Sequence, residues 1–358
     1  MARDLPLALQ TLYAELVERC SMARFTDDFP PSGSFLKRTV AGRDYCYFQA
    51  ATSDGRRQRY VGPDSPELRQ RIVRHREAKD DRRERRQMVV ALQRVGLPVP
   101  DPTTGRVLEA LAEAGVFRLR AVVVGTVAYQ SYSGLLGVRL ADAETRTADL
   151  DLAQFREVSI AVEDAIDLPF GDILARVDPG FRAVPYAMDG RHSHSFVLGD
   201  GRYRVDILVP NRGPDADRPV PLPALRTEGQ PLRYLDFLIR DEVRAVALWG
   251  AGVPINVPAP ERYALHKLLV SRMRIATADS QAKAQKDLRQ AGELARILAL
   301  RRPYELRDLW AELRGRGARW RRLADEGATL LEPGAREALM GAVAGVTPAP
   351  ARSDGPGS

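Results

Sequence analysis

The sequence predicts an α+β fold, because two β-rich regions precede a long helical one. Residues 35–60 are rich in β-formers and contain Asp54-Gly55, a strong hairpin signal. Further short β-rich stretches lie between 119 and 248, and residues 260–300 and 303–342 have helical periodicity. We therefore expect a small N-terminal helix and β-meander region, a sheet-containing core and a C-terminal helical domain.

The composition describes an ordinary globular protein with a basic bias. The 358 residues suffice for two or three domains, and the 44% hydrophobic content supports a sizeable core. Lys and Arg total 54 against 47 acids, a net charge of +7, so an anionic partner such as nucleic acid or a phosphorylated ligand is plausible. Only Cys20 and Cys46 are present, which excludes a disulfide framework and favours a reducing, cytoplasmic location.

The N-terminus is expected to form a helix and not a targeting segment. Residues 4–20 contain acids and have apolar side chains at helical spacing, unlike a signal peptide, and Pro30, Pro31 and Gly33 break the helix afterwards. No apolar run approaches the roughly 18 residues of a membrane span, so no membrane partner is expected. The spaced apolar residues are Leu5, Leu9, Leu12, Leu16 and Val17.

Residues 35–96 combine β structure with strong positive charge. A turn at Ala41-Gly42 divides the expected meander, and Ser65 opens a capping-type start, SPEL, to a helix reaching about Gly96. Between Arg69 and Arg86 this helix has nine Lys or Arg and four acids, which fits either a solvated face of i,i+4 pairs or a phosphate-contacting surface. The basic and aromatic residues of the meander are Lys37, Arg38, Tyr45, Tyr47, Arg56, Arg57, Arg59 and Tyr60.

The middle of the chain alternates helices and strands. A helix over 104–114 leads through Gly115 into an apolar strand over 119–124. No repeat of fixed period is visible, and the Pro/Ala/Gly/Ser-rich tail after about Val346 is expected to be disordered. Later strands are expected near 148–153, 181–188, 194–198, 203–209, 234–239 and 243–248.

Three aspartates interrupt apolar strands in this region. In TADLDLAQF, Asp149 and Asp151 share one strand face while the alternating leucines share the other. Two acids on one face repel, and a protein keeps such a pair chiefly where a cation offsets the repulsion; oxygen ligands suit Mg²⁺ or Mn²⁺. Asp206 in RYRVDILVP is a third acid in an apolar strand, although each Asp alone also fits a strand edge or turn.

A glycine turn precedes the acids. The segment VVVGT ends a buried strand at Gly125 and Thr126, where the absence of a Cβ lets backbone N–H groups and a hydroxyl approach a triphosphate. A glycine turn, a D-x-D strand and a later single Asp form the arrangement needed for two-metal nucleotidyl transfer.

These motifs resemble the nucleotidyltransferase superfamily, which includes DNA polymerase beta, the aminoglycoside nucleotidyltransferases and the abortive-infection type toxins. The resemblance implies a mixed-sheet catalytic core, a nucleoside triphosphate substrate such as ATP, and two metal ions held by Asp149, Asp151 and Asp206. It further implies that Gly125 and Thr126 touch the phosphates and that the third carboxylate helps to activate the acceptor hydroxyl.

The resemblance continues into the helical region. INVPAPERYALHKLLVSRMR is similar to the proline-led helix after the last catalytic strand, which implies that Lys267 reaches the triphosphate, with Arg272 or Arg274 as a second candidate. KAQKDLRQAGELARIL resembles the family's Lys-Asp helix, which adds Lys283, Lys286 and Asp287 to the nucleotide-binding set. A solvated helix face is the alternative interpretation of these lysines.

One departure from the family concerns spacing. Gly125 precedes Asp149 by 24 positions, longer than in small members, and the insert could extend a helix and loop over the site. VGTVAYQ resembles a little-characterised bacterial branch with the turn G-T-x-A-[YF], matched at Gly125, Thr126, Ala128 and Tyr129.

Other motifs are weaker. His192 and His194 share a strand face but lack a third ligand at familiar spacing, so a surface or acceptor-site role is favoured over metal binding. His266 is interpreted as a packing or capping residue. No G-x-S-x-G or Walker-type motif is present, which argues against serine hydrolases and P-loop proteins.

The sequence therefore predicts a metal-dependent transfer of a nucleoside monophosphate from a triphosphate to an acceptor hydroxyl. RNA such as tRNA is one acceptor, suggested by the basic segments and by Arg314, Arg316, Arg319, Arg321 and Arg322. A protein or small-molecule hydroxyl is the alternative acceptor, and a non-catalytic nucleic-acid-binding or toxin–antitoxin interaction protein is the alternative function. The expected parts are 1–95 (helix, meander and basic helix), 96–258 (catalytic domain), 259–345 (helical domain) and 346–358 (tail).

Overall fold

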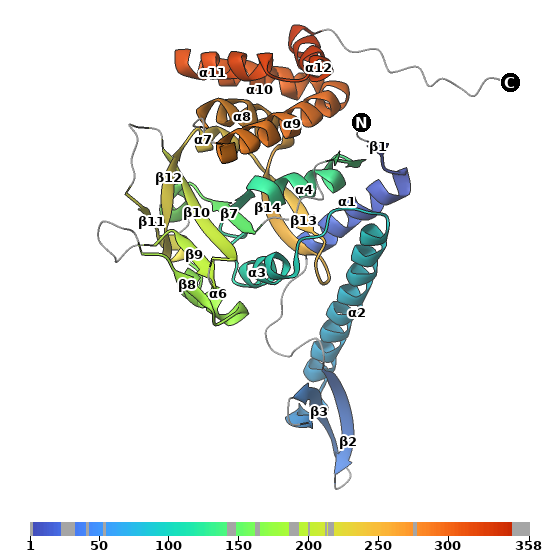
Figure 1. Ribbon diagram of the computed structural model, residues 1–358. Coiled ribbons are helices and arrows are strands. Elements are labelled where there is room, and N and C mark those ends of the chain that lie inside the picture. The colour runs from blue at the N-terminus through green and yellow to red at the C-terminus, as the bar shows by residue number, and fades with distance from the viewer. Residues whose placement is uncertain are drawn as a thin grey trace, which may run out of the picture.

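A mixed β-sheet with helices packed around it forms the body of the molecule in the computed structural model (Figure 1). The structure describes residues 3–22, 33–40, 43–52, 55–141, 148–161, 165–185, 193–199, 201–211, 213, 218–274 and 278–345. An N-terminal arm extends from this body, and a layer of C-terminal helices covers one end of the sheet. The predicted α+β fold is thus confirmed.

The central sheet combines parallel and antiparallel strands. Its main order is β11 (Val220–Leu222), β12 (Thr227–Arg233), β10 (Tyr203–Asn211), β7 (Asp149–Ala153) and β5 (Val122–Val124). β10 runs parallel to both β7 and β12, whereas β5 is antiparallel to β7. The chain thus places the two aspartate-bearing strands side by side in the middle of the sheet. The remaining strands, β9 (Ser195–Leu198) and β8 (Phe181–Ala183), extend the sheet beside β10.

Helices and short strands complete the body around this sheet. Asp101 caps α3 (Pro102–Glu113), because its side chain accepts hydrogen bonds from the backbone N–H groups of Thr103 and Thr104. α4 (Gly125–Leu135) begins directly where β5 ends. The other elements are α5 (Arg156–Ala161), α6 (Phe170–Val177), α7 (Leu235–Leu238), the 3-10 turn η2 (Pro223–Leu225), the pair β1 (Arg3–Asp4) and β6 (Val138–Arg139), and the hairpin β13 (Glu242–Ala247) and β14 (Val253–Pro258).

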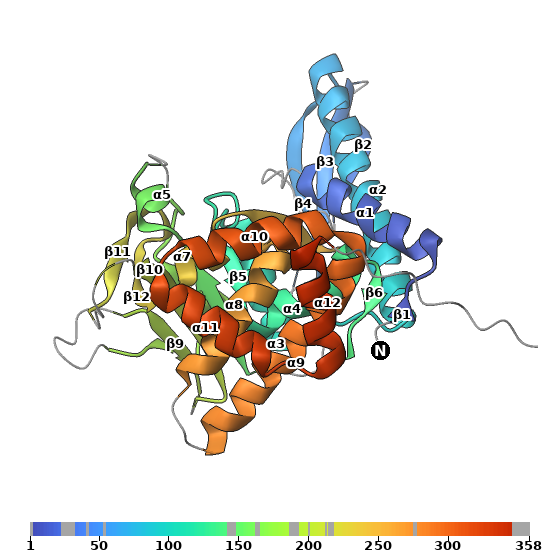
Figure 2. The same cartoon turned by 90° about the horizontal axis from the view of Figure 1, so that it is seen from above.

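The C-terminal helices pack as a layer around α8 (Pro260–Met273), seen from above in Figure 2. α8 begins with Pro260, which suits the first helical turn because proline lacks the N–H that would have no partner there. Most of its residues are buried, so α8 is a core helix and not an amphipathic surface helix. Around it lie α9 (Ala278–Arg301), α10 (Pro303–Gly315), α11 (Ala318–Thr329) and α12 (Pro333–Ala344).

The N-terminal arm consists of a long helix and a three-stranded meander. β2 (Ser34–Val40), β3 (Arg43–Thr52) and β4 (Gly55–Pro63) pair in antiparallel order, as the sequence predicts. α2 (Pro66–Arg94) connects this meander to the body, and the Ser65 side chain accepts the Leu68 N–H, which confirms the expected cap (Figure 1). Lys37 forms ion pairs with Asp44 and Asp64, so its charge is partly balanced within the meander.

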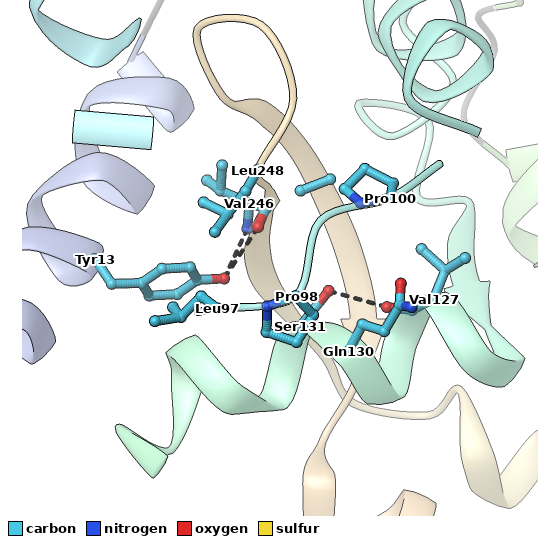
Figure 3. Close-up of a pocket in the computed structure, with 10 residues that line it drawn as sticks. Tyr13, Leu97, Pro98, Pro100, Val127, Gln130, Ser131, Val246 and Leu248 are labelled. Atoms are coloured by element: carbon cyan, nitrogen blue, oxygen red, sulfur yellow. Dashed lines mark hydrogen bonds between the residues drawn. The ribbon is translucent and has the colours of Figure 1, made fainter. Parts of the chain in front are cut away.

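α1 (Leu7–Met22) joins the arm to the body through a small contact region shown in Figure 3. The Tyr13 hydroxyl donates to the Val246 carbonyl and accepts from the Val246 N–H, both at 3.2 Å. It therefore satisfies both backbone polar groups of this β13 residue. Ser131 on α4 lies in the same region and donates to Val127. Because Tyr13 is buried, its two bonds are made away from water and position α1 against β13, while α1 also packs against α4.

Arg85 shows that part of the arginine-rich helix is structural. Arg85 is only 6% exposed, and its guanidinium pairs with Asp81 at 2.7 Å and donates to the Ala251 carbonyl at 3.0 Å. A buried charge of this kind needs all of these partners to offset its lost hydration. At this position, therefore, the helix docks on the β13–β14 turn instead of facing solvent or a phosphate backbone.

The structure corrects several predicted elements. The strand expected at 234–239 is wrong: Tyr234 adopts a left-handed φ of 67° and the chain continues into α7. β11, β12 and β14 were not expected, because Pro221, Pro231 and Pro254 lower the strand signal of their segments. The strand expected over 119–124 is limited to β5, since Arg120 has a left-handed φ of 64°.

Some predictions concern residues outside the described ranges. They are the Ala41-Gly42 turn, Asp54 of the hairpin signal, His192 and the tail after Val346. The proposed division at 95, 258 and 345 also remains a prediction. None of the helices in the described part of the chain combines the length and apolar content that crossing a membrane requires.

Replacing Leu152 by Ala should destabilise the protein by about 2–5 kcal/mol, because Leu152 is fully buried on β7 and the truncation leaves a cavity behind the aspartates. Urea unfolding followed by circular dichroism measures the effect. Leu300→Ala is the matched control, since Leu300 is 57% exposed and should change stability by no more than about 0.5 kcal/mol. Equal unfolding midpoints for the two variants would contradict the proposed packing.

Candidate active site

The three predicted aspartates lie together on one face of the sheet. In the β7–β10 register Asp151 is opposite Asp206, so the two carboxylates project from neighbouring strands. Leu150 and Leu152 are fully buried on the other face, as the strand alternation predicts. Asp149 is exposed, Asp151 is half-buried and the Asp206 side chain is 24% exposed. The acids therefore form a partly open cluster above a closed hydrophobic layer.

The glycine turn lies directly against this cluster. Val124, the last residue of β5, is opposite Asp151 in the sheet, and Gly125 follows with a φ of 68°. A Cβ added to Gly125 would lie 2.6 Å from Asp151 Oδ2, closer than real contacts allow. Both the left-handed backbone and this close approach require glycine.

The turn also opens a helix toward the acids. Val124 is the N-cap of α4 and provides no side-chain cap for the first N–H groups of the helix. Such an N-terminus favours anions, because its backbone N–H groups can donate hydrogen bonds to them and the positive end of the helix dipole attracts negative charge. The arrangement has the chemistry of a phosphate-binding turn beside a carboxylate cluster.

Burial and neighbouring charges raise the pKa of the central carboxyl. Burial is the largest cause, and the charges of Asp149 and Asp206 add to it, so the pKa of Asp151 rises to about 7 although Lys267 opposes the shift. At neutral pH the three acids are therefore not all charged unless a cation joins them. Carboxylate oxygens suit Mg²⁺ or Mn²⁺, so this donor set fits the predicted ions. Among the residues that the structure describes, however, no group of three His, Cys, Asp or Glu side chains is arranged so that it could hold a metal ion.

Lys267 reaches this region from α8 but is held by a buried acid. Its Nζ lies 2.6 Å from Asp287 Oδ1 and 5.1 Å from the centre of the Tyr263 ring, and only 15% of the side chain is exposed. Burial alone would lower the pKa of Lys267, but Tyr263 and Asp287 outweigh it and raise that pKa. Asp287 is 2% exposed and also accepts from Arg274 at 2.8 Å. Asp287 therefore holds the side chains of Lys267 and Arg274 in place. It would affect a bound nucleotide only through these two cations.

The other predicted basic residues are placed differently. Lys286 on α9 donates to the Thr126 hydroxyl at 3.1 Å, so it lies at the glycine turn. Lys283 is exposed on the same helix, one turn earlier. Arg272 instead pairs with Glu326 on α11 at 3.2 Å, whereas Arg274 lies beside Asp287. Of the two arginine candidates, Arg274 is the one associated with the lysine and aspartate of the site.

Tyr263 is a residue of this region that sequence reasoning missed. Its hydroxyl donates to the Gly125 carbonyl at 3.0 Å, and its ring packs with Tyr129 and Tyr132 of α4. Tyr129 in turn donates to Glu293 on α9 at 2.7 Å. These buried contacts fix the glycine turn against two C-terminal helices. The available signal was spacing, because Tyr263 precedes Lys267 by one helical turn.

The described histidines do not form a metal site. His194 is half-buried beside β10, and burial lowers its pKa despite the nearby Asp206. His266 is 6% exposed, and burial lowers its pKa to about 3, so it is a neutral core residue as expected. Ser195, which the sequence did not single out, is buried opposite Asp206 in the β9–β10 register.

A family model identifies the class of protein to which the chain belongs. The family model described as nucleotidyltransferase matches residues 102–315, more than half of the chain, and the chain therefore belongs to the nucleotidyltransferase family. No curated protein matches the sequence. Among solved structures, an antigenic nucleotidyltransferase-like protein from Paracoccidioides brasiliensis is similar with a TM-score of 0.31 and 15% identity, over 64% of this chain and 95% of that chain.

Gly125→Ala should destabilise the protein by at least about 1–2 kcal/mol, because alanine is strained at positive φ and its methyl group would press on Asp151. Thermal unfolding measures this change. Gly334→Ala is the control: a Cβ there meets nothing within 4 Å, and alanine favours the helix. Equal midpoints for Gly125→Ala and the unmodified protein would refute the required left-handed turn.

The raised pKa of Asp151 predicts a pH dependence in metal-free buffer. The folded state keeps a proton on Asp151 up to about pH 7, whereas the unfolded carboxyl loses it near 3.8. The free energy of unfolding should therefore fall as pH rises between these values. Urea midpoints at pH 5 and 7.5 in a chelating buffer measure the slope, and Asp151→Asn should reduce it. An unchanged slope in that variant would assign the pH dependence to other groups.

Proposed function

We propose that this nucleotidyltransferase moves a nucleoside monophosphate from a triphosphate to an acceptor hydroxyl and releases pyrophosphate. The observation that carries the proposal is the half-buried Asp151, pressed against the Gly125 turn and crowded by Asp149 and Asp206. A cluster of this kind is unfavourable in isolation and becomes favourable when cations and phosphates complete it. Membership of the nucleotidyltransferase family supports the same reaction class.

The proposed roles follow from the position of each residue. Asp149, Asp151 and Asp206 would hold one or two Mg²⁺ or Mn²⁺ ions. When bound, these ions would neutralise the phosphates and lower the pKa of the acceptor hydroxyl. The N–H groups at Gly125 and the Thr126 hydroxyl would bind phosphate oxygens at the start of α4.

The C-terminal helices would orient this phosphate site. The Tyr263 hydroxyl donates to the Gly125 carbonyl, and the Lys286 ammonium donates to the Thr126 hydroxyl. When a triphosphate binds, a phosphate oxygen would accept a hydrogen bond from Lys286 in place of Thr126. Lys267 would balance charge on the departing pyrophosphate while Asp287 keeps it in place. In the transfer step the acceptor oxygen bonds to the α-phosphorus as the bond to pyrophosphate breaks. The hydroxyl proton passes to the Asp206 carboxylate.

We further propose RNA as the acceptor, with a protein or small-molecule hydroxyl as the alternative. The support is the excess of basic residues together with exposed arginines such as Arg319 and Arg321 on α11. Other basic residues are occupied: Arg314 pairs with Asp325 at 3.0 Å, and Lys37 and Arg85 pair with acids of the arm. The charge that remains for an acceptor is therefore smaller than the composition suggests.

A non-catalytic interaction protein on the same fold is the competing proposal. Such a protein would have no use for three acids crowded beside a glycine turn. Magnesium-dependent binding of a nucleoside triphosphate separates the two, because only a working donor site needs it. Binding that is independent of both magnesium and Asp149 would favour the interaction protein.

Incubation with each triphosphate labelled at the α-phosphate, total RNA and cell lysate should transfer label to one pool in the presence of Mg²⁺. Asp149→Asn should reduce the rate of this transfer by roughly a hundredfold or more, because removing one charged or hydrogen-bonding group from an active site typically lowers the rate by about that factor. Asp149 is exposed, so the variant should remain folded.

Asp308→Asn is the matched control, because Asp308 is 72% exposed on α10 and lies outside the acid cluster. Full activity of Asp149→Asn would overturn the assignment. If RNA is labelled, transfer should weaken steeply as salt increases, whereas salt-insensitive labelling of a small molecule would exclude RNA as the acceptor.

A further inference from the structure

The net positive charge of the chain lies in the N-terminal arm. Residues 33–95 contain 16 Lys or Arg and eight acids, a net charge of +8, whereas the rest of the chain contains 38 Lys or Arg and 39 acids. The arm projects from the body, and α2 forms its stem (Figure 1). Charge of one sign gathered on a projecting element is the electrostatic footprint of a surface that binds a polyanion.

Five basic residues of α2 line up along one side of the helix. They fall within about 80° around its axis and along about 27 Å of its length, because each residue turns an α-helix by about 100° and advances it by about 1.5 Å. None of the acids of α2 falls within this sector. We call this set the basic stripe, and its members are Arg76, Lys79, Arg83, Arg86 and Arg94.

The other side of α2 holds the helix against the body. Arg85 and Leu92 are buried there, on the side of the helix away from the stripe. Two acids of α2, Asp81 and Glu84, pair with Arg19 of α1 at 3.4 and 2.6 Å. Docking of the arm therefore engages acids of α2 with a cation of α1 and leaves the basic stripe outside the contact.

The stripe lacks the spacing of a helix face that is neutralised by its own ion pairs. Such a face has acids three or four residues from its cations. Arg86 has no acid at these distances on either side, and Arg83 has only Asp80, three residues before it. Another cation stands four residues before each of the two arginines, and like charges at this spacing destabilise a helix. Arg83 and Arg86 are both exposed, so an external anion can reach them and offset the repulsion.

We propose that the basic stripe of α2 binds the phosphate backbone of RNA. A nucleic-acid strand carries its charges in regular succession, which matches a straight row of cations. Four of the five stripe residues are arginines, whose guanidinium groups bind phosphate oxygens with two parallel hydrogen bonds. A membrane surface fits less well, because a membrane-bound helix buries an apolar face in the lipid, whereas Val89 and Leu92 of α2 pack on the body.

The proposal rests on the proposed function in one respect, the identity of this RNA as the acceptor. The stripe would then hold the strand that receives the nucleotide. Binding of the strand needs neither metal nor triphosphate, so it is measured separately from the transfer reaction.

Fluorescence anisotropy of the full chain with a short labelled single-stranded RNA, in a chelating buffer without triphosphate, tests the stripe. The variant with both Arg83→Gln and Arg86→Gln should bind this RNA at least about tenfold more weakly. The slope of log Kd against log salt concentration should fall by about 1.4, because each phosphate contact with a single strand contributes about 0.7 to it.

Two further variants are the controls. Arg106→Gln with Arg336→Gln removes the same charge from exposed positions on α3 and α12, and should change Kd by less than about twofold and leave the salt slope unchanged. Arg83→Lys with Arg86→Lys keeps the charge of the stripe and should bind at least about threefold more tightly than the Gln variant.

Unchanged RNA binding in the Gln variant, equal weakening in the α3–α12 control, or no RNA binding by the unmodified protein would overturn the proposal. Competition by polyglutamate as strong as that by unlabelled RNA would overturn it in favour of an acidic protein partner. Label transfer to a small molecule, with RNA still bound by the stripe, would reject RNA as the acceptor alone. Labelled RNA, with unchanged binding in the Gln variant, would reject the stripe alone.

Discussion

Crowding of three carboxylates on one sheet face is the constraint on which the site depends. Asp151 cannot leave the cluster, because its strand pairs on one side with Val124 and on the other with Asp206, and the leucines beside it are buried. Burial, and then the charges of Asp149 and Asp206, raise the pKa of Asp151 to about 7. The same confinement leaves space only for glycine at position 125, where β5 passes into α4. The sheet register, the glycine turn and the proposed metal binding are thus linked by one packing arrangement.

The C-terminal helices belong to this arrangement. Tyr263 and Lys267 on α8 and Lys286 on α9 all act at or beside the glycine turn, and buried Asp287 orders the cations there. The buried ion pair of Lys267 and Asp287 fixes the position of the lysine but adds little net stability, because the cost of removing both charges from water offsets much of their attraction. The family match from 102 to 315 spans both the sheet and α8 to α10, as expected if strands and helices build one site.

The positive charge of the chain is distributed unevenly between structure and surface. Arg85 docks the arm, Arg316 braces aromatic rings, and Lys37 is bridged within the meander. A net charge of +7 is therefore a poor guide to where an anion binds. β10 runs from the acid cluster to a pocket at its far end, whose lining includes Arg233, Arg316 and Arg319.

Local features of the chain could be predicted from the sequence alone. Alternation placed Asp149 and Asp151 opposite the buried leucines, and the glycine marked the turn, because these properties depend on neighbouring residues. The expected strand at Tyr234 failed, because the left-handed turn is stabilised by Trp320, which is distant in sequence. The register of Asp151 against Asp206 and the choice of Arg274 over Arg272 beside Asp287 were likewise decided only in the tertiary structure. Strand register and buried ion pairs join side chains far apart in the chain, and packing alone brings them together.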